Sequence, residues 1–548
     1  MRMMYLTDIH DDLAGVERVL RASTSDFYVV AGDLIYRAFK TDKTLFRFFE
    51  IQEQMRGLRR RMEFEGSPYE LADEIARAGD RGDEHLPLAR EYRRLVHRAR
   101  ENMLRRYEDM EALFARHPDK PIFVLPGNYD MNLAETALAH RDLHLRVHEV
   151  EGLRIAGYGG AQVFTPGIPE SLIVKFNESR DHGRNYSEAY DFFMKTRPDM
   201  AVTHHPPYGI FDKLAHYGNI GSPGLRQYVD TGYSKILLTG HMHENWGVEL
   251  HAGTVCVNPS NFGKAQRPGK LPKGSYFCGI RLHAGFFLAC SLRQVEGEGY
   301  RDIVDYYPTE RGIRELILDP HLYMELGEFK PRRERHVREV RIFNRVKSYF
   351  RGYDTDESRR RIAMLRRLYR DFAERGVEIA FDVMGSTNFG MTERTSDLDL
   401  VMYLRDTRVE AREHFAAEVP EEITTALAAL SAAEGFPIHL VDAINLQRVL
   451  KAIHRRDPED LQLERFVLYR AIGRPVNIRM LAKTEALLAK HANFKYAVER
   501  KVRDFFRSLI RTSEHAYSFK KYEVRLHTRD ITIPPSVERI IREHLGVE

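Results

Sequence analysis

Five short apolar segments within the first 245 residues each lead into residues that can bind a metal. The motifs that follow them are Asp8-Ile9-His10, Gly32-Asp33, Gly127-Asn128-Tyr129-Asp130, His204-His205-Pro206-Pro207 and Gly240-His241-Met242-His243. Short apolar runs bounded by turns predict buried strands, and the carboxyl ends of strands in a layered α/β sheet converge on one edge. We therefore expect two aspartates, one asparagine and four histidines to meet in a single crevice.

The donor atoms in this predicted crevice are oxygens and imidazole nitrogens. Such a site suits Mn, Fe, Zn or Co better than metals that prefer thiolates. Seven ligands exceed the number that one ion binds, so a carboxylate shared by two ions about 3.5 to 4 Å apart is the simplest arrangement. A pair of ions at this spacing holds the attacking and leaving oxygens during phosphoryl transfer.

The order and spelling of the motifs resemble those of the calcineurin-like metallophosphoesterases over about residues 1–305. The resemblance implies a four-layer β-sandwich flanked by helices, two divalent metals, and phosphodiesterase or phosphatase activity. His205 is expected to contact phosphate or to pack, and Arg37, four residues after Asp33, is a candidate for binding phosphate. The resemblance also implies a ligand set: Asp8, His10 and His243 on the first metal, Asn128, His204 and His241 on the second, and Asp33 bridging the two. It implies that Asp33 and Asn128 are catalytic residues as well.

One position departs from the family pattern. The usual motif, G-N-H-[DE], has a histidine where this chain has Tyr129, and that histidine commonly assists departure of the leaving group. The tyrosine hydroxyl, with an unperturbed pKa near 10, is poorly matched to proton transfer at neutral pH. The resemblance to family members that lack this histidine favours a phosphodiester, or another substrate with a good leaving group, over an alkyl phosphomonoester.

Up to about residue 308 the chain alternates short apolar runs with helical patterns, which is typical of an α/β (α+β) core. Residues from about 40 to 117 show only Arg/Glu-rich helical periodicity, which we interpret as a helical insertion. Its positive and negative charges nearly cancel, so it is more typical of solvated helix faces than of a dedicated substrate lid. We predict a first domain over residues 1–308.

A second group of functional residues follows the apolar run at residues 380–384. After Gly385-Ser386 come ten other residues and then Asp397-Leu398-Asp399. Two carboxylates at positions i and i+2 of an extended segment project to one face, which suits Mg²⁺ on a nucleotide. A Gly-Ser turn can approach a phosphate closely and donate hydrogen bonds to it.

This arrangement resembles the DNA polymerase beta-like nucleotidyltransferases over about residues 376–445. The resemblance implies a small mixed-sheet domain, which helical additions extend to residues 376–548, and Mg with an NTP as cofactors. It further implies that the triphosphate is held by Gly385 and Ser386 and that the metals are bound by Asp397 and Asp399.

A third carboxylate in this family normally comes from a later strand. Asp442, at the end of an apolar run, is the best match, although the neighbouring His439 leaves the choice open. Without a third carboxylate in place, the domain could bind a nucleotide without transferring it.

A linker predicted over residues 309–375 is strongly basic. Residues 330–375 contain 16 Lys and Arg against 7 Asp and Glu, whereas the whole chain has a formal net charge of only +4. Apolar spacing in this stretch predicts two amphipathic helices with Arg-rich polar faces. Solvated helix faces would explain the pattern; the alternative is a surface for a polyanion such as RNA or a nucleotide.

The three cysteines, Cys256, Cys278 and Cys290, are odd in number and lack C-x-x-C spacing. They predict neither a disulfide framework nor a zinc ribbon, and they indicate a reducing cytoplasm. No run of about 18 apolar residues is present to cross a membrane. Residues 3–6 are expected to form a core strand rather than a signal peptide.

Together the two sets of motifs predict a bifunctional cytoplasmic enzyme that joins a phosphoesterase to a nucleotidyltransferase. Our leading hypothesis is the processing of nucleic-acid ends or nucleotides, with RNA favoured over DNA and no membrane partner. The alternative is a regulatory or defence module in which the transferase modifies a protein or small molecule and the esterase reverses the modification or hydrolyses a cyclic nucleotide. A third hypothesis is a binding protein in which one or both sites are inactive.

Overall fold

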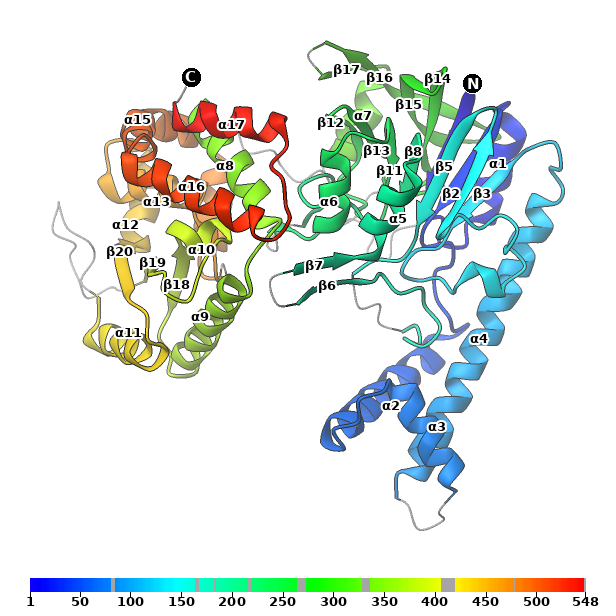
Figure 1. The fold of residues 1–548 in the computed structure, drawn as a ribbon, viewed down its shortest axis with the longest axis horizontal. Coiled ribbons are helices and arrows are strands. Elements are labelled where there is room, and N and C mark those ends of the chain that lie inside the picture. The colour runs from blue at the N-terminus through cyan, green and yellow to red at the C-terminus, as the bar shows by residue number, and fades with distance from the viewer. Residues whose placement is uncertain are drawn as a thin grey trace. The chain divides into compact units, whose positions relative to one another are not determined.

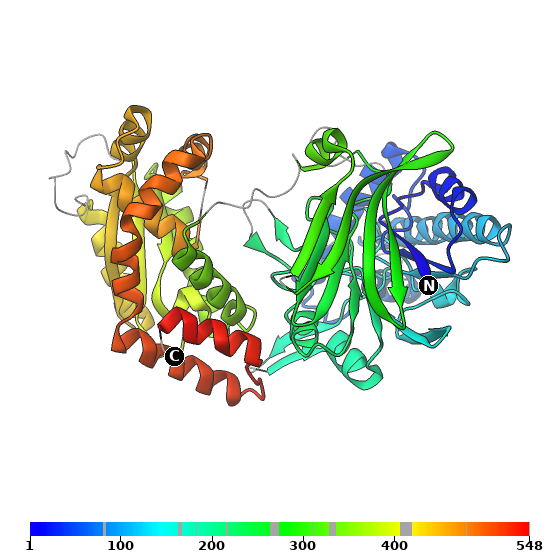
Figure 2. The ribbon, with the colours of Figure 1, turned by 90° about the horizontal axis from the view of Figure 1, so that it is seen from above.

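The computed structural model (Figures 1 and 2) describes residues 1–548 except 80–83, 163–166, 182–183, 215–217, 264–272, 311, 328–335, 406–418, 478 and 547–548. The chain forms two compact units, each a mixture of helices and sheet. The first comprises Met1–Ser179 and Tyr186–Pro331, and the second comprises Arg180–Asn185 and Arg332–Glu548.

The first large sheet of the first unit has seven strands. They are β1 (Arg2–Thr7), β2 (Phe27–Ala31), β3 (Ile122–Leu125), β14 (Tyr276–His283), β15 (Phe286–Glu296), β16 (Gly299–Thr309) and β17 (Gly312–Ile317). Their order in the sheet is β17-β16-β15-β14-β1-β2-β3. The strands β1, β2 and β3 are parallel, and the other neighbouring pairs are antiparallel.

The second large sheet has six strands. They are β4 (Arg146–Val150), β5 (Leu153–Tyr158), β8 (Met200–Thr203), β11 (Ile236–Leu238), β12 (Gly247–His251) and β13 (Thr254–Asn258), in the order β12-β13-β11-β8-β5-β4. Parallel pairing joins β5, β8, β11 and β13. Two small two-stranded sheets pair β6 (Glu178–Asp181) with β7 (Arg184–Ser187) and β9 (Lys213–Leu214) with β10 (Gly218–Asn219).

Alternating side chains on the strands build a layered core. In β1, Met3 and Tyr5 belong to a cluster shared by the two large sheets, whereas Met4 and Leu6 belong to a cluster on the opposite face. This follows from the two-residue period of a strand. Helices α1 (Leu13–Ala22) and α4 (Leu86–Phe114) contribute to that outer cluster, and α5 (Glu188–Thr196) and α6 (Pro223–Asp230) cover the six-stranded sheet. The first unit is therefore helix, sheet, sheet and helix in succession.

Three helices occupy most of the predicted insertion. They are α2 (Asp42–Arg61), α3 (Pro68–Ala78) and α4, and Figure 1 shows α4 as a long helix with α2 and α3 beside one end of it. Helix α3 begins at a capping box, in which Ser67 and Glu70 exchange side-chain and backbone hydrogen bonds. One face of α4 packs into the core cluster through residues such as Tyr92, Met103 and Tyr107. The insertion therefore has a buried face of its own, which is continuous with the core cluster through α4.

The second unit is built around a four-stranded sheet in the order β20-β19-β18-β21, with β18 (Ile379–Val383), β19 (Leu398–Leu404), β20 (Ile438–Asn445) and β21 (Arg474–Pro475). The sheet is mixed, because β19 pairs parallel to β20 and antiparallel to β18. Its helices are α8 (Arg338–Arg351), α9 (Asp356–Glu374), α10 (Gly385–Phe389), α11 (Glu421–Glu434), α12 (Leu446–Arg455), α13 (Leu461–Ile472), α14 (Ala482–Ala489), α15 (Ala492–Ile510), α16 (Ser513–His527) and α17 (Pro535–Leu545).

The predicted basic linker is divided between the two units. Strand β17 and helix α7 (Pro320–Gly327) belong to the first unit, and α8 and α9 belong to the second. Both predicted amphipathic helices form, because α8 and α9 bury their apolar faces in the clusters of the second unit. Two of the basic residues, Lys347 and Arg361, are buried. Residues 330–335 of this stretch lie outside the described residues.

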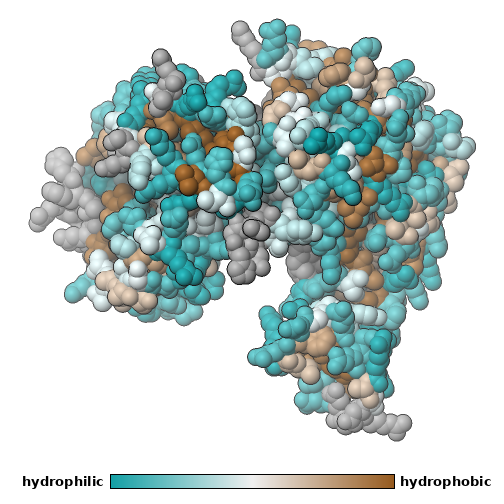
Figure 3. All heavy atoms as spheres, viewed as in Figure 1, coloured by the Kyte–Doolittle hydropathy of each residue, from teal (hydrophilic) through white to brown (hydrophobic). Residues whose placement is uncertain are grey.

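The surface in the view of Figure 3 is mostly hydrophilic, with separate hydrophobic areas. None of the helices in the described ranges is both long and apolar enough to cross a membrane. The cysteines Cys256, Cys278 and Cys290 are all buried and unpaired.

Two histidines in the second unit should make its stability depend on pH. The side chains of His515 and His544 form a hydrogen bond of 2.9 Å between their Nε2 atoms. Burial lowers the pKa of His515 to about 4 and that of His544 to about 3. Because an unfolded histidine has a pKa near 6.5, the unfolded state binds more protons below that pH. We expect the free energy of unfolding to fall by about 1 kcal/mol per histidine between pH 7.5 and 5.5.

Hydrogen exchange of peptides from α16 and α17 during urea titration measures this loss. The double variant H515Q/H544Q removes both titrating groups and should flatten the pH dependence. An unchanged pH dependence in the double variant would assign the effect to other groups.

Candidate functional site

The first candidate site lies where five strands of the first unit end. Two large sheets contribute to it, and within each sheet the contributing strands are parallel, so their carboxyl ends share one edge. The predicted ligands are Asp8 and His10 after β1, Asp33 after β2, Asn128 after β3, His204 after β8, and His241 and His243 after β11.

These side chains form two adjacent groups that could each hold a metal ion. In each group one donor atom per residue lies within 4.8 Å of the others. His243 Nε2 is 3.2 Å from Asp8 Oδ1, and His204 Nε2 is 3.4 Å from Asp33 Oδ1. Asn128 Oδ1, 3.0 Å from His204 Nε2, adds an oxygen beside the second group. The groups are Asp8, His10 and His243, and Asp33, His204 and His241.

The backbone at this site is held in an unusual conformation. Asp8, His10, Asp33 and His241 have φ angles of 55°, 42°, 43° and 66°, a region that residues other than glycine seldom adopt. Backbone hydrogen bonds stabilise it: Asp8 N donates to Gly32 O at 3.1 Å, and His10 N donates to Asp33 O at 3.0 Å. Such strain persists only where surrounding contacts over-determine the conformation, which is typical of functional sites.

Glycines in the motifs are required by close approach. A Cβ on Gly32 would lie 1.8 Å from His204 Nδ1, and a Cβ on Gly127 would lie 2.1 Å from the backbone nitrogen of Asp33. Both distances are far shorter than van der Waals contact. The glycines of G-D and G-N-x-D therefore allow the loops to pack against the ligands.

The electrostatics of the site favour a bound cation. Burial lowers the pKa of His241 to about 4, so its imidazole is neutral near pH 7 and free to bind a metal. Burial also acts to lower the pKa of His204, but the carboxylates of Asp33 and Asp8 outweigh it and raise that pKa to about 9. The excess of negative charge thus keeps a proton on His204, and a divalent cation would displace that proton.

A buried carboxylate supports the loop after β3. Asp130 accepts hydrogen bonds from Leu34 N at 2.9 Å, Gly127 N at 2.7 Å and the Tyr107 hydroxyl at 3.1 Å. Burial, together with the charge of Asp33, raises the pKa of Asp130 to about 7. Because Tyr107 lies on α4, the helical insertion contacts this loop directly. No sequence pattern indicated this role, since Tyr107 belongs to no motif.

Tyr129 stands beside the first ligand group. Its ring is 5.8 Å from that of His10, and the ring of Tyr36 lies 6.0 Å from His10. The backbone nitrogen of Tyr129 donates to Asp33 Oδ1 at 2.9 Å. Two phenol rings therefore flank His10, with a phenol where the family pattern has an imidazole.

Two secondary candidates make contacts of their own. His205 is completely buried, with ring contacts to Phe176 at 5.1 Å and His241 at 5.6 Å, and it belongs to neither ligand group. Arg37 forms an ion pair of 2.5 Å with Asp42 at the start of α2. Phosphate binding by either residue stays a prediction.

The second candidate site is a cavity of about 470 Å³ in the second unit. Gly385 and Ser386 at the start of α10 line it together with Asp397 and Asp399. Gly385 has a φ of +55°, and a Cβ there would lie 2.2 Å from Asp399 Oδ2. Gly385 is therefore in direct contact with Asp399, although the two residues are far apart in the sequence.

His439 lies beside the carboxylate pair, and the role of Asp442 as a third carboxylate stays a prediction. His439 Nδ1 lies 3.4 Å from Asp397 Oδ2 and 3.6 Å from Asp399 Oδ1, and the three residues form a candidate metal-binding group. Asp442 is buried and paired with Arg465, whose Nε is 2.6 Å from Asp442 Oδ2. An irregularity in the β19–β20 pairing sets Asp442 opposite Val401, whereas His439 is opposite Asp399.

Residues that no motif indicated line the same cavity. They come from helix α16, more than a hundred residues after the carboxylate pair, and are His515, Ser518, Lys521, Tyr522 and Arg525. Arg525 Nε forms an ion pair of 2.7 Å with Glu393, in the segment that precedes the carboxylates. In a single sequence, a cluster of basic and aromatic residues in a C-terminal helix is only a weak indication of a binding site. The fold is what brings these residues to the cavity.

No protein-family model matches this chain, and no curated protein matches it. Similar solved structures include a conserved uncharacterized protein, a predicted phosphoesterase, from Streptococcus pneumoniae, with 11% identity and a TM-score of 0.22 over 55% of this chain and 96% of that chain. Wild-type Vps29 complexed with Zn²⁺ from Entamoeba histolytica has 9% identity and a TM-score of 0.22 over 58% and 97%.

A hypothetical protein from Thermus thermophilus has 12% identity and a TM-score of 0.26 over 55% of this chain and 99% of that chain. Similarity at this level does not assign an activity to this chain.

The first site should lose metal when its central carboxylate is neutralised. We expect D33N, after loading with Mn²⁺ and dialysis, to retain at most about half the metal of the natural chain, because each ion depends on charged donors in place. Metal content by mass spectrometry measures the loss. The matched control is D119N, which changes an exposed aspartate, and full retention of metal by D33N would contradict the assignment.

Proposed function

We propose that the first unit is a phosphoesterase that depends on two divalent cations. The observation that carries this proposal is the pair of adjacent ligand groups, built only from oxygen and imidazole donors at converging strand ends. Asp33 belongs to the second group, and its charge also acts on His10 of the first. A carboxylate that interacts with both groups is suited to bridge two ions.

The residues of the site have distinct roles in this proposal. Bound cations would lower the pKa of an attacking water and stabilise the leaving oxygen. Asp8, Asp33 and the neutral His241 supply the charge and lone pairs that hold the cations. Asp130 keeps the loop that carries Asn128 in place by accepting hydrogen bonds from two backbone amides and a phenol.

Tyr129 supports a phosphodiester as the substrate. A general acid works best when its pKa lies near the operating pH, and the unperturbed pKa of a phenol, near 10, lies far from it. A leaving group that needs little protonation would depart without such help. We infer that diesters with good leaving groups are hydrolysed in preference to alkyl phosphomonoesters.

Kinetics with Mn²⁺ test this inference. We expect bis-p-nitrophenyl phosphate to have a higher kcat/KM than p-nitrophenyl phosphate. The variant Y129H should raise hydrolysis of glycerol phosphate by about tenfold or more, since a positioned general acid contributes about 10²- to 10⁴-fold. Y36H, which places a histidine at the other tyrosine that contacts His10, is the matched control. A natural enzyme that prefers glycerol phosphate would refute the proposal.

We further propose that the second unit binds a nucleoside triphosphate with Mg²⁺ and transfers its nucleotidyl group. The favouring observation is the cavity in which a Gly-Ser turn contacts a carboxylate pair. Lys521 and Arg525 on the cavity wall add positive charge that suits phosphate. His439 beside Asp397 and Asp399 supplies a third possible metal donor.

The substrate we favour is the end of a nucleic acid. The sequence favours RNA over DNA. Part of the basic stretch is used within the fold, because Arg359 and Arg360 form ion pairs and Lys347 donates to backbone carbonyls. Exposed arginines on α8 and α9 support an anionic partner: Arg341, Arg345, Arg366, Arg367 and Arg370. A protein or small-molecule acceptor is the alternative.

The variant D399N should separate the two activities. We expect it to lower incorporation of labelled nucleotide by about 100-fold or more, because the carboxylate pair holds the metal, while phosphoesterase kcat/KM stays within about twofold. Labelled NTP is offered with an RNA oligonucleotide and, separately, with the protein alone. Label on RNA supports end processing, and label only on protein supports the alternative. Equal incorporation by D399N would contradict the second proposal.

A further inference from the structure

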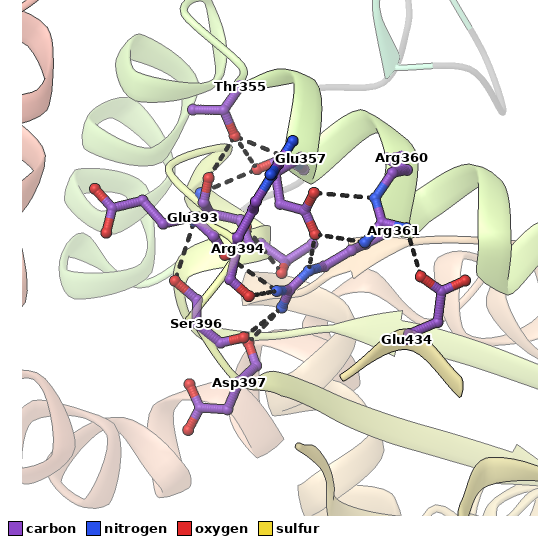
Figure 4. A network of polar contacts seen from close by, with 12 residues as sticks. Thr355, Glu357, Arg360, Arg361, Glu393, Arg394, Ser396, Asp397 and Glu434 are labelled. Atoms are coloured by element: carbon purple, nitrogen blue, oxygen red, sulfur yellow. Dashed lines mark hydrogen bonds and ion pairs between the residues drawn. The ribbon is translucent and has the colours of Figure 1, made fainter. Parts of the chain in front are cut away.

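Arg361 on α9 is a completely buried arginine beneath the carboxylate pair of the second unit. Burying a guanidinium away from water is unfavourable unless its charge is paired and every N–H donates a hydrogen bond. Figure 4 shows it enclosed by α9 and by the segment that leads into β19. Its contacts therefore report what the charge is used for.

All five N–H donors of Arg361 are used. Nη1 donates to the carbonyls of Ser396 at 2.7 Å and Asp397 at 3.1 Å, and Nη2 donates to those of Glu393 at 3.0 Å and Arg394 at 3.2 Å. Nε donates to the Glu357 carboxylate at 2.8 Å. Four of the five donors thus hold backbone carbonyls of one short segment.

The guanidinium itself is held from two sides. Its Cζ lies 3.7 Å from the ring centroid of Phe436, just before β20. Glu357 also accepts from Arg360, which forms an ion pair with Glu434 near the end of α11. Figure 4 shows this chain of contacts running from α9 to Glu434. The arginine therefore has little freedom to move away from the segment it holds.

The segment it holds carries the candidate metal ligands. Residues 391–397 form neither helix nor strand, so their carbonyls lack partners from regular structure. Asp397 and Asp399 are 52% and 28% exposed and repel each other, which opposes any fixed arrangement of the pair. Beyond the segment the backbone is anchored, since Leu398 N donates to Pro437 O and Met384 N donates to Asp399 O, both at 2.9 Å.

We propose that Arg361 is a positioning residue that holds residues 393–397 so that Asp397 and Asp399 present their carboxylates together to Mg²⁺ and a nucleotide. The inference rests on the nucleotide-binding function proposed for this unit. A lysine cannot replace it, because an ammonium has three donors and no planar fork, whereas the segment and Glu357 take five. The metal site would then depend on a residue that binds neither the metal nor the nucleotide itself.

Binding of methylanthraniloyl ATP to the full-length protein, followed by fluorescence as Mg²⁺ is varied, tests the proposal. We expect R361K to raise the Mg²⁺ concentration at half-saturation by about tenfold, as for loss of a residue that orients metal ligands, with binding restored at high Mg²⁺. The matched control is R455K, the same change at an exposed arginine of α12, which should stay within about twofold of the natural chain. A loss of stability alone would lower the amount of folded protein. It would leave the Mg²⁺ concentration at half-saturation of the protein that remains folded unchanged.

The outcomes separate this inference from the function on which it rests. If the natural chain binds the nucleotide and D399N does not, yet folded R361K has the natural Mg²⁺ dependence, the positioning role is overturned. If R361K does not fold, F436L, which removes the ring beneath the guanidinium but none of its hydrogen bonds, should raise the half-saturation about two- to fivefold, and no change would overturn the role. If the natural chain binds no nucleotide, the proposed function fails and this role fails with it.

Discussion

Carboxylates and imidazoles that gather at the ends of neighbouring strands repel or lose solvation, and both candidate sites depend on how the protein offsets that cost. In the first unit the backbone turns into left-handed conformations at Asp8, Asp33 and His241, which inter-strand hydrogen bonds stabilise. In the second unit a buried arginine, Arg361, holds the segment before Asp399 through four carbonyls. Both solutions fix the ligands with groups that are not ligands.

The strands that carry the first site were predictable from sequence, because local patterns suffice for them. All five apolar runs form strands, and each ends just before its ligand-type residues. The alternation seen in β1 then assigns opposite faces to Met3 and Met4 without further information. Glycine positions were also informative, since Gly32 and Gly385 sit where a Cβ would collide with a ligand side chain.

Other parts of the sites depend on contacts between distant segments. Tyr107 reaches Asp130 only because α4 packs across the sheet, and Lys521 reaches the cavity only because α16 folds back over α10. Within the second site, His439 lies opposite Asp399 on the neighbouring strand, whereas Asp442 pairs with Arg465. Which residue of β20 lies opposite Asp399 depends on the register of pairing between segments that are distant in the sequence.

Metal-ligand types, their order and the strands that carry them are properties of short segments, so the chain's local patterns were enough to predict two α/β regions and most of their candidate ligands. Tertiary packing decided which ligands share a group, which arginines are buried and which helices line the cavity. The basic stretch illustrates the difference. Its charge is plain in the sequence, yet Lys347 and Arg361 are buried while other arginines of the stretch are exposed. Burial is set by what packs against a residue, and that is fixed only when distant segments meet.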